Sequence, residues 1–262
     1  MEERLQWITL QPKSWVHWEP LRGGLHIHQA LSNRYPEAAC AVIESDSGHA
    51  QAVQAALEKP WWTPKRWLGS KTRFQMPAPG KADMLWANMA LHMSAQPQSL
   101  LASWQNLLAV DGFLMFSCLG PDTLRELRTL FADLKWPAPA HDFTDMHDWG
   151  DMLVQTGFAE PVMDMERITL SFETPERLLQ ELRALGRNLH RDRFPALRGR
   201  HWRDQLHREL RSRLTGADGR LSVTFEVIYG HALKAAPRLS VQPQTTLTLD
   251  QMRESLSRNK RH

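Results

Sequence analysis

Short apolar runs alternate with amphipathic stretches through the first 170 residues of the chain. The runs are typical of strands, and the stretches, whose apolar residues recur with helical spacing, are typical of helices. The expected strands span residues 14–19, 38–43, 66–69, 82–88, 113–118, 161–172 and 221–233. The expected helices span residues 25–31, 48–58, 97–109, 124–131, 145–157 and 174–185. This alternation predicts an α/β fold in which helices cover a largely parallel sheet.

Three of the expected helices carry start signals in the sequence. Thr123 precedes the helix at 124–131, and Glu126 completes the pattern of a capping box. Asp145 is placed to cap its own helix, and the helix at 174–185 begins with Thr-Pro-Glu. These signals predict where the three helices begin.

The sequence changes character after the helix at 174–185. Ten arginines lie between positions 183 and 213, and only Asp192, Asp204 and Glu209 oppose them. This segment predicts a helical insertion at about 176–216, before the last strand. We expect one domain over residues 1–235, followed by a polar, basic tail at 236–262.

The turn after the first strand is the clearest candidate for a ligand site. Glu19 closes that strand, and Glu44 closes the next one 25 residues later. Carboxylates at the carboxyl ends of neighbouring strands are how an open α/β sheet holds a nucleoside-like cofactor, and glycines in the first turn let the backbone approach it. Only Gly23 and Gly24 remain in this turn. The sequence therefore predicts a nucleoside site with a glycine-poor turn.

Composition narrows the function only slightly. The net charge of +3 gives no general argument for nucleic acid, and no nucleic-acid recognition motif is present. No apolar run reaches the roughly 18–20 residues of a membrane span, and the first residues lack the apolar core of a signal peptide. Cys40 and Cys118 lie in apolar runs, so we expect buried thiols in a cytoplasmic protein.

Histidines and aspartates gather between residues 141 and 148. The group consists of His141, Asp142, Asp145, His147 and Asp148, and its spacing matches no common zinc site. Capping by Asp145 and ordinary surface polarity explain it better, so no metal is expected.

Several segments together resemble one known family. They are 82–92 (ADMLWANMALH), 112–127, 145–153 (DMHDWGDML), 156–166 (TGFAEPVMDME), 178–188 (LLQELRALGRN) and 219–231 (GRLSVTFEVIYGH). In order and sequence they are similar to the malonyl-acyl-carrier-protein O-methyltransferases of biotin synthesis. The resemblance implies a class I methyltransferase that uses S-adenosylmethionine (SAM), with a Rossmann-like sheet of seven strands whose last strand is antiparallel. Members of this family methylate the free carboxylate of a malonyl thioester on acyl carrier protein.

The resemblance also assigns cofactor-binding positions in this chain. It implies that Glu19 lies beside the methionine portion of SAM and that Glu44 holds the ribose. Ser70 falls where the family places a residue near the adenine, and Asn88 falls where it lines the cofactor pocket. Methyl transfer to a carboxylate needs alignment more than a general base, so no catalytic residue is assigned.

The family's loop glycines fall on Leu21, Gly23 and Leu25, so two of the three are replaced, and Gly24 stands beside the survivor. A leucine at a position with positive φ is strained by roughly 1–2 kcal/mol, and its side chain takes up ligand space. Two functions therefore stay open. One is a SAM-dependent carboxyl O-methyltransferase, and the other is an inactive pseudo-methyltransferase that has lost SAM and serves as a binding or assembly partner.

The arginine-rich insertion is the second candidate for function. Acyl carrier proteins are strongly acidic, so a basic face beside the pocket suits docking and steering. Arg183, Arg187 and Arg191 fall on or just after the helix that family members place over the pocket, and they are our candidates for binding the malonyl carboxylate. A solvated basic helix face is the competing interpretation.

Overall fold

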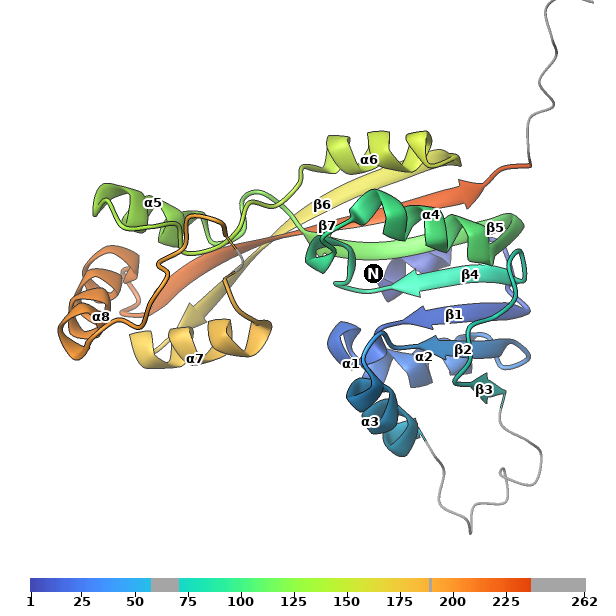
Figure 1. Ribbon diagram of the computed structural model, residues 1–262, viewed down its shortest axis with the longest axis horizontal. Coiled ribbons are helices and arrows are strands. Elements are labelled where there is room, and N and C mark those ends of the chain that lie inside the picture. Colours follow the sequence, from blue (N-terminus) through green and yellow to red (C-terminus); the bar gives the residue numbers. More distant parts are fainter. Residues whose placement is uncertain (58–70, 189, 237–262) are drawn as a thin grey trace, which may run out of the picture.

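The computed structural model describes residues 1–57, 71–188 and 190–236 (Figure 1). In these residues one seven-stranded sheet has the order β3-β2-β1-β4-β5-β7-β6. Its strands are β1 (Ser14–Trp18), β2 (Ala39–Ile43), β3 (Thr72–Arg73), β4 (Ala82–Ala87), β5 (Leu108–Leu119), β6 (Phe158–Phe172) and β7 (Leu221–Lys234). Neighbours among β1 to β5 pair in parallel, and β7 is antiparallel to both β5 and β6. The predicted α/β sheet with an antiparallel last strand is confirmed.

Helices cover both faces of this sheet because each presents an apolar stripe to it. Trp104 and Trp149 are buried on the face that α4 and α6 cover, and Leu5 and Leu31 are buried on the opposite face. The helices concerned are α4 (Pro97–Leu107) and α6 (Met146–Gln155) on the first face, and η1 (Glu2–Trp7), α2 (His26–Arg34) and α3 (Ser47–Leu57) on the second. Strands enclosed in this way are apolar on both sides, which explains the continuous apolar runs in the sequence.

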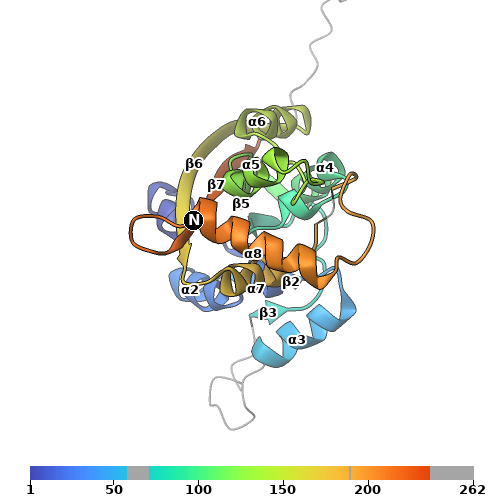
Figure 2. The same cartoon turned by 90° about the vertical axis from the view of Figure 1, so that its left-hand side faces the viewer.

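Strands β6 and β7 continue beyond the sheet as a two-stranded ribbon (Figure 1). Helices α5 (Arg125–Asp133), α7 (Pro175–Leu185) and α8 (Arg200–Leu214) gather around the far end of this ribbon (Figure 2). We call these three helices and the ribbon end the lobe. Leucines of all three helices pack with Leu221, Val223 and Phe225 of β7 in a third core. Helices α7 and α8 lie between β6 and β7 in the chain, where the helical insertion was expected.

Two of the predicted helix starts are confirmed by their caps. A carboxylate oxygen of Asp145 accepts a hydrogen bond from the His147 amide at 2.8 Å, directly before α6. The hydroxyl of Thr174 accepts one from the Arg177 amide at 3.2 Å, directly before α7. Local sequence signals fix both boundaries.

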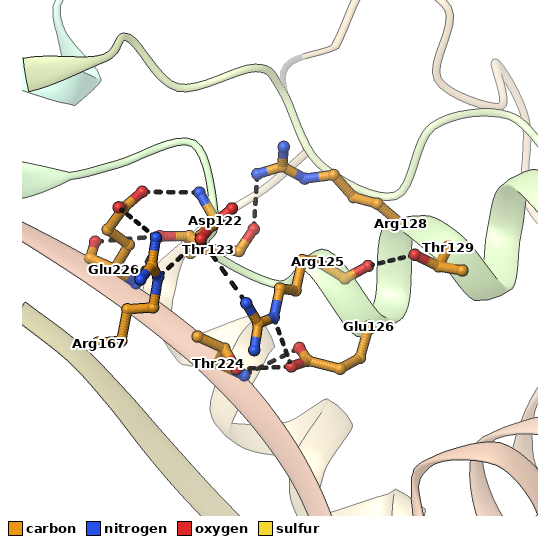
Figure 3. Close-up of polar contacts among 9 residues, drawn as sticks. All are labelled: Asp122, Thr123, Arg125, Glu126, Arg128, Thr129, Arg167, Thr224 and Glu226. Carbon is orange, nitrogen blue, oxygen red and sulfur yellow. Dashed lines mark hydrogen bonds and ion pairs between the residues drawn. The ribbon is translucent and has the colours of Figure 1, made fainter.

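The predicted capping box at Thr123 and Glu126 is wrong. Helix α5 follows Leu124, a left-handed residue with φ 58°, and has no side-chain cap. The Thr123 hydroxyl instead donates to the carbonyl of Glu226 in β7 and accepts from its amide, both at 3.1 Å (Figure 3). The Glu126 carboxylate accepts from the amide and the hydroxyl of Thr224. Contacts with a distant strand replace the local cap because they satisfy groups that the ribbon would otherwise bury unpaired.

Three parts of the sequence prediction lie outside the described residues. These are the strand at 66–69, Ser70, and residues 237–262 of the tail. The strand at the β3 edge that the structure does describe is Thr72–Arg73, which pairs with β2.

Candidate functional site

A cavity of about 1340 Å³ lies where the carboxyl ends of the strands face the lobe. Its walls come from the turn after β1, the segment after β4, the start of α5, the chain around residues 137–143, and α7 and α8 with their connection. Ordinary ligand pockets enclose roughly 300–1,000 Å³, so this cavity has room for more than one small group. Open α/β sheets bind ligands outside the carboxyl ends of their strands, and this cavity is therefore the candidate site.

The turn after β1 packs so tightly that it requires its two glycines. It forms α1 (Pro20–Gly23), and a Cβ on Gly23 would stand 2.6 Å from the Asn88 carbonyl oxygen. Gly24 has φ +99°, a conformation that side chains rarely adopt. A side chain at Gly23 would push the turn away from the residue that follows β4, and one at Gly24 would be strained and would meet the His26 ring at 2.9 Å.

The leucines in this turn are not strained. Leu21 lies in α1, and Leu25 has φ −61° and ψ −28°, an ordinary helical conformation. The left-handed non-glycine residue of the turn is Glu19, with φ 47°. Leu25 packs against the core under α2, while Leu21 lines the cavity. Of the two costs expected for the lost glycines, backbone strain is absent at Leu21 and Leu25, and only Leu21 stands at the cavity.

Glu44 follows β2 and is drawn into the turn. Its Oε1 accepts a hydrogen bond from the Leu21 amide at 2.8 Å, and its side chain is only 1% exposed. Its Oε2 is buried without a hydrogen-bond partner, and Nδ1 of His49 is 3.8 Å away. Burial raises the pKa of the Glu44 carboxyl, and the Leu21 amide opposes that rise.

The other predicted cofactor residues form hydrogen bonds around the same turn. Glu19 accepts a hydrogen bond from the Ser45 hydroxyl at 2.5 Å. In the side-chain amide of Asn88, the nitrogen donates to the Gly23 carbonyl and the oxygen accepts from the Ser117 hydroxyl. This side chain therefore joins the ends of β4 and β5 to the turn. The structure therefore brings Glu19, Gly23, Gly24, Glu44 and Asn88 together around one turn.

These residues fit a cofactor that carries a ribose. A buried carboxylate oxygen without a partner is costly, and Oε2 of Glu44 lacks the donor that a ribose hydroxyl would supply. Because the side chain is 1% exposed, the turn has to open for a ligand to reach this oxygen. Leu21, whose amide donates to Glu44, already lines the cavity.

The three candidate arginines lie near the cavity to different degrees. Arg183 and Arg187 are exposed and line it, on the last turn of α7 and just after that helix. Arg191 is exposed and does not line it. The two lining arginines are therefore the better-placed members of the predicted set.

It was not predicted from the sequence that one group of polar residues comes together at the cavity. His92 and His141 line the cavity beside Phe143, with ring centroids 5.9 Å and 4.5 Å from that of Phe143. The Arg128 guanidinium lies 5.7 Å from the same ring, and one of its terminal nitrogens donates to the Thr123 carbonyl. In the sequence, His141 was considered only within the histidine and aspartate group at 141–148, and His92 lies four residues after Asn88.

Other chemistry finds little support in the described parts of the chain. No cluster of three or more metal-ligating side chains occurs there, and no helix there is long and apolar enough to cross a membrane. Cys40 and Cys118 are buried free thiols, and burial raises the pKa of both.

Comparison with solved structures identifies the fold. The chain is similar to a putative methyltransferase from Bacillus halodurans, with a TM-score of 0.58 and 16% identity, over 90% of this chain and 98% of that one. It is also similar to the YcgJ protein of Bacillus subtilis, with a TM-score of 0.56 and 11% identity, over 90% and 98% of the two chains.

Sequence comparison is more specific, although no family model matches the chain. A malonyl-[acyl-carrier protein] O-methyltransferase of Gallionella capsiferriformans is 38% identical over 92% of this chain and 83% of its own length. The protein of the same name from Legionella pneumophila is 33% identical, over 90% and 82% of the two chains. The chain belongs to the malonyl-[acyl-carrier protein] O-methyltransferase family.

Proposed function

We propose that this protein transfers a methyl group from SAM to the free carboxylate of a malonyl group on an acyl carrier protein, in biotin precursor synthesis. The observation that carries the proposal is the unpartnered Oε2 of Glu44. The same carboxylate accepts a hydrogen bond from the amide of Leu21, a residue that lines the large cavity. Family membership supplies the reaction. When bound, SAM provides a methyl group on an activated sulfonium centre.

The chain's own part is binding and alignment. Glu44 is assigned to the ribose, Glu19 to the methionine portion, and Gly23 and Gly24 to the close approach of the backbone. Asn88 is assigned to the pocket wall, and its side chain donates a hydrogen bond to the Gly23 carbonyl in the turn. Ser70 keeps its assignment near the adenine as a prediction, since it lies outside the described residues. A malonyl carboxylate is ionised at neutral pH, so these residues need to orient the substrate and exclude water, without removing a proton.

The carrier protein is proposed to dock on the arginines beside the cavity. Arg183, Arg187 and Arg191 form no ion pair with any residue in the described ranges, so their charges are available to an acidic partner. Arg183 and Arg187 line the cavity, where a carrier-bound malonyl group would enter. Such charges act mainly on the rate of encounter, and salt screens them.

The pseudo-methyltransferase alternative has no observation in its favour on the described residues. It rested on strain and blockage from Leu21 and Leu25. Both leucines have helical conformations and Leu25 packs against the core, so only Leu21 stands at the cavity. A closed turn is compatible with an enzyme because Glu44 retains an oxygen for a ligand.

Calorimetric titration with S-adenosylhomocysteine tests the proposal, followed by a methyl-transfer assay on malonyl carrier protein. We expect binding that Glu44→Ala weakens by roughly 10- to 100-fold, as for a lost hydrogen bond to a charged group. The matched control is Glu37→Ala, an exposed acid paired with Lys71 beyond the site. We also expect the KM for the carrier protein to rise with salt. Absence of binding at millimolar ligand would overturn the proposal and support the inactive alternative.

A further inference from the structure

Three nitrogen-bearing side chains surround Phe143 at the wall of the cavity. His92 and His141 line the cavity close to that ring, and the Arg128 guanidinium lies 5.7 Å from it. They come from the segment after β4, the loop before α6, and α5. We call His92, His141 and Arg128 the nitrogen corner.

His92 presents a neutral N–H group to the cavity. Its Nδ1 accepts a hydrogen bond from the Leu119 amide at 3.4 Å, so the neutral ring carries its hydrogen on Nε2. Burial, together with a smaller contribution from the neighbouring His141, lowers the pKa of His92 to about 4. Nε2 has no hydrogen-bond partner within the described residues, and it is therefore available as a donor.

Arg128 supplies the charge of this corner. It is half-buried, and its Nε is buried without a hydrogen-bond partner. Among the described residues no carboxylate pairs with it, and its one hydrogen bond goes to the Thr123 carbonyl. Burial and then the charge of Arg128 lower the pKa of His141, while Asp142, which is largely exposed, opposes them. A half-buried cation without a counter-ion favours an anion in the space beside it.

The corner includes a residue close in the chain to the predicted cofactor residue Asn88. His92 follows Asn88 by four residues, and Met89 between them also lines the cavity. A carboxylate that accepts a methyl group has to lie within about 3–3.5 Å of the methyl carbon in the reactive arrangement. The acidic end of the substrate therefore belongs at the cavity wall that the nitrogen corner forms.

We infer that His92 and His141 hold the substrate's carboxylate at this wall, with Arg128 behind them as the compensating charge. This inference rests on the proposed function and names the residues that recognise its substrate. One carboxylate oxygen accepts the His92 N–H, and the other forms the bond to the methyl carbon. The bond from that carbon to sulfur breaks, its electron pair stays on sulfur, and no proton moves. A neutral donor suits the task because it leaves the attacking oxygen its negative charge.

The test compares malonyl and acetyl carrier protein, which differ by the carboxylate. Equilibrium binding is measured with S-adenosylhomocysteine present, so that no turnover occurs. Wild type is expected to prefer the malonyl form. His92→Leu should reduce that preference by roughly 10-fold or more, and His92→Gln, which keeps an N–H donor, should retain most of it. Arg128→Gln should also reduce the preference without changing the affinity for the acetyl form.

The control is His231→Leu, because His231 is a half-buried histidine in β7 whose pKa burial also lowers and which does not line the cavity. It should leave the malonyl preference unchanged. If wild type prefers the malonyl form and His92→Leu does too, this inference is overturned and the proposed function stands. If wild type binds S-adenosylhomocysteine but shows no preference for the malonyl form and no methyl transfer, both fall.

Discussion

The sheet and the lobe share one cavity, but different forces hold them together. The sheet encloses large side chains that are almost fully buried, among them Trp15, Trp86, Trp104 and Trp149. The lobe has a core made mainly of leucines, and a group of charged and hydroxyl side chains links α5 and the segment before it to the ribbon (Figure 3). Loss of a buried aromatic leaves a void, whereas loss of a polar contact leaves unpaired groups and a segment free to shift.

Hydrogen bonds and ion pairs join the segment before α5 to β6 and β7. The Asp122 amide donates to Glu226 at 2.8 Å, and Arg167 of β6 pairs with the Asp122 carboxylate at 2.7 Å. Glu226 is 4% exposed, and a Cβ on Gly120 would stand 2.6 Å from its Oε2. The segment that follows Gly120 leads to Thr123 and on to the cavity wall. These contacts therefore fix the geometry of the site as well as the position of the lobe.

The largest predicted effect belongs to the sheet. Trp104 is fully buried and makes an edge-on contact with Trp18, with ring centroids 5.8 Å apart. Trp104→Ala should lower the free energy of unfolding by about 3–5 kcal/mol, as is typical of a buried tryptophan. Urea unfolding followed by circular dichroism measures the change.

Trp202→Ala in the lobe is the matched comparison. Trp202 is half-buried and contacts Trp136, with ring centroids 5.2 Å apart, and the guanidinium of Arg198. Its removal should cost less than that of Trp104, because part of the ring is already in water. Equal losses for the two variants would contradict the contrast between sheet and lobe.

A smaller loss of stability but a larger effect on the site is expected for Glu226→Ala. It leaves the Asp122 amide without its acceptor, at a cost of roughly 1–3 kcal/mol. Because the same segment carries Thr123 at the cavity, kcat/KM should fall while binding of S-adenosylhomocysteine at the other end is retained. Glu226→Gln keeps an acceptor and should preserve both properties. Parallel loss of cofactor affinity in Glu226→Ala would show that the lobe is not a separate influence on the site.

The sequence predicted the sheet better than the lobe for a physical reason. Strands such as β4 and β5 are apolar because helices cover both faces, and that pattern is visible in the chain itself. The caps at Asp145 and Thr174 were predictable because donor and acceptor lie within three residues. Thr123 and Glu126 have the same local pattern, yet their partners on β7 lie about a hundred residues away. A pattern read along the chain carries no information about such partners.

The candidate site shows the same limit. The positions of Glu19, Glu44 and Asn88 at strand ends could be predicted, because parallel strands bring their carboxyl ends to one edge. Nothing in the chain indicated that Glu44 accepts a hydrogen bond from the Leu21 amide or that Leu25 packs against the core. In the sequence, Arg128 looks like any polar residue of an amphipathic helix, and only folding brings its guanidinium to 5.7 Å from the Phe143 ring.

Acid should destabilise the sheet through His17 and His28. Their Nδ1 atoms are 3.2 Å apart, and burial lowers the pKa of His17 to about 3 and that of His28 to about 4, from 6.5. Below about pH 6.5 the unfolded chain takes up protons on both rings and the folded chain does not. Stability is therefore complete above this pH and falls as the pH drops toward the folded pKa values. The loss is ~1 kcal/mol for each histidine between about pH 6.5 and 5.5.

Replacing both rings tests whether this loss originates in the sheet. The double variant His17→Leu/His28→Leu removes donor and acceptor together, so no unpaired partner remains between the two rings. As the pH is lowered, its unfolding free energy should fall less steeply than that of the wild type. The control His147→Leu, at an exposed position on α6, should show the slope of the wild type. An unchanged slope in the double variant would move the acid sensitivity to other buried histidines, of which His92 lies at the cavity and His231 on β7. In that case histidines other than the His17 and His28 pair would set the acid limit of the fold.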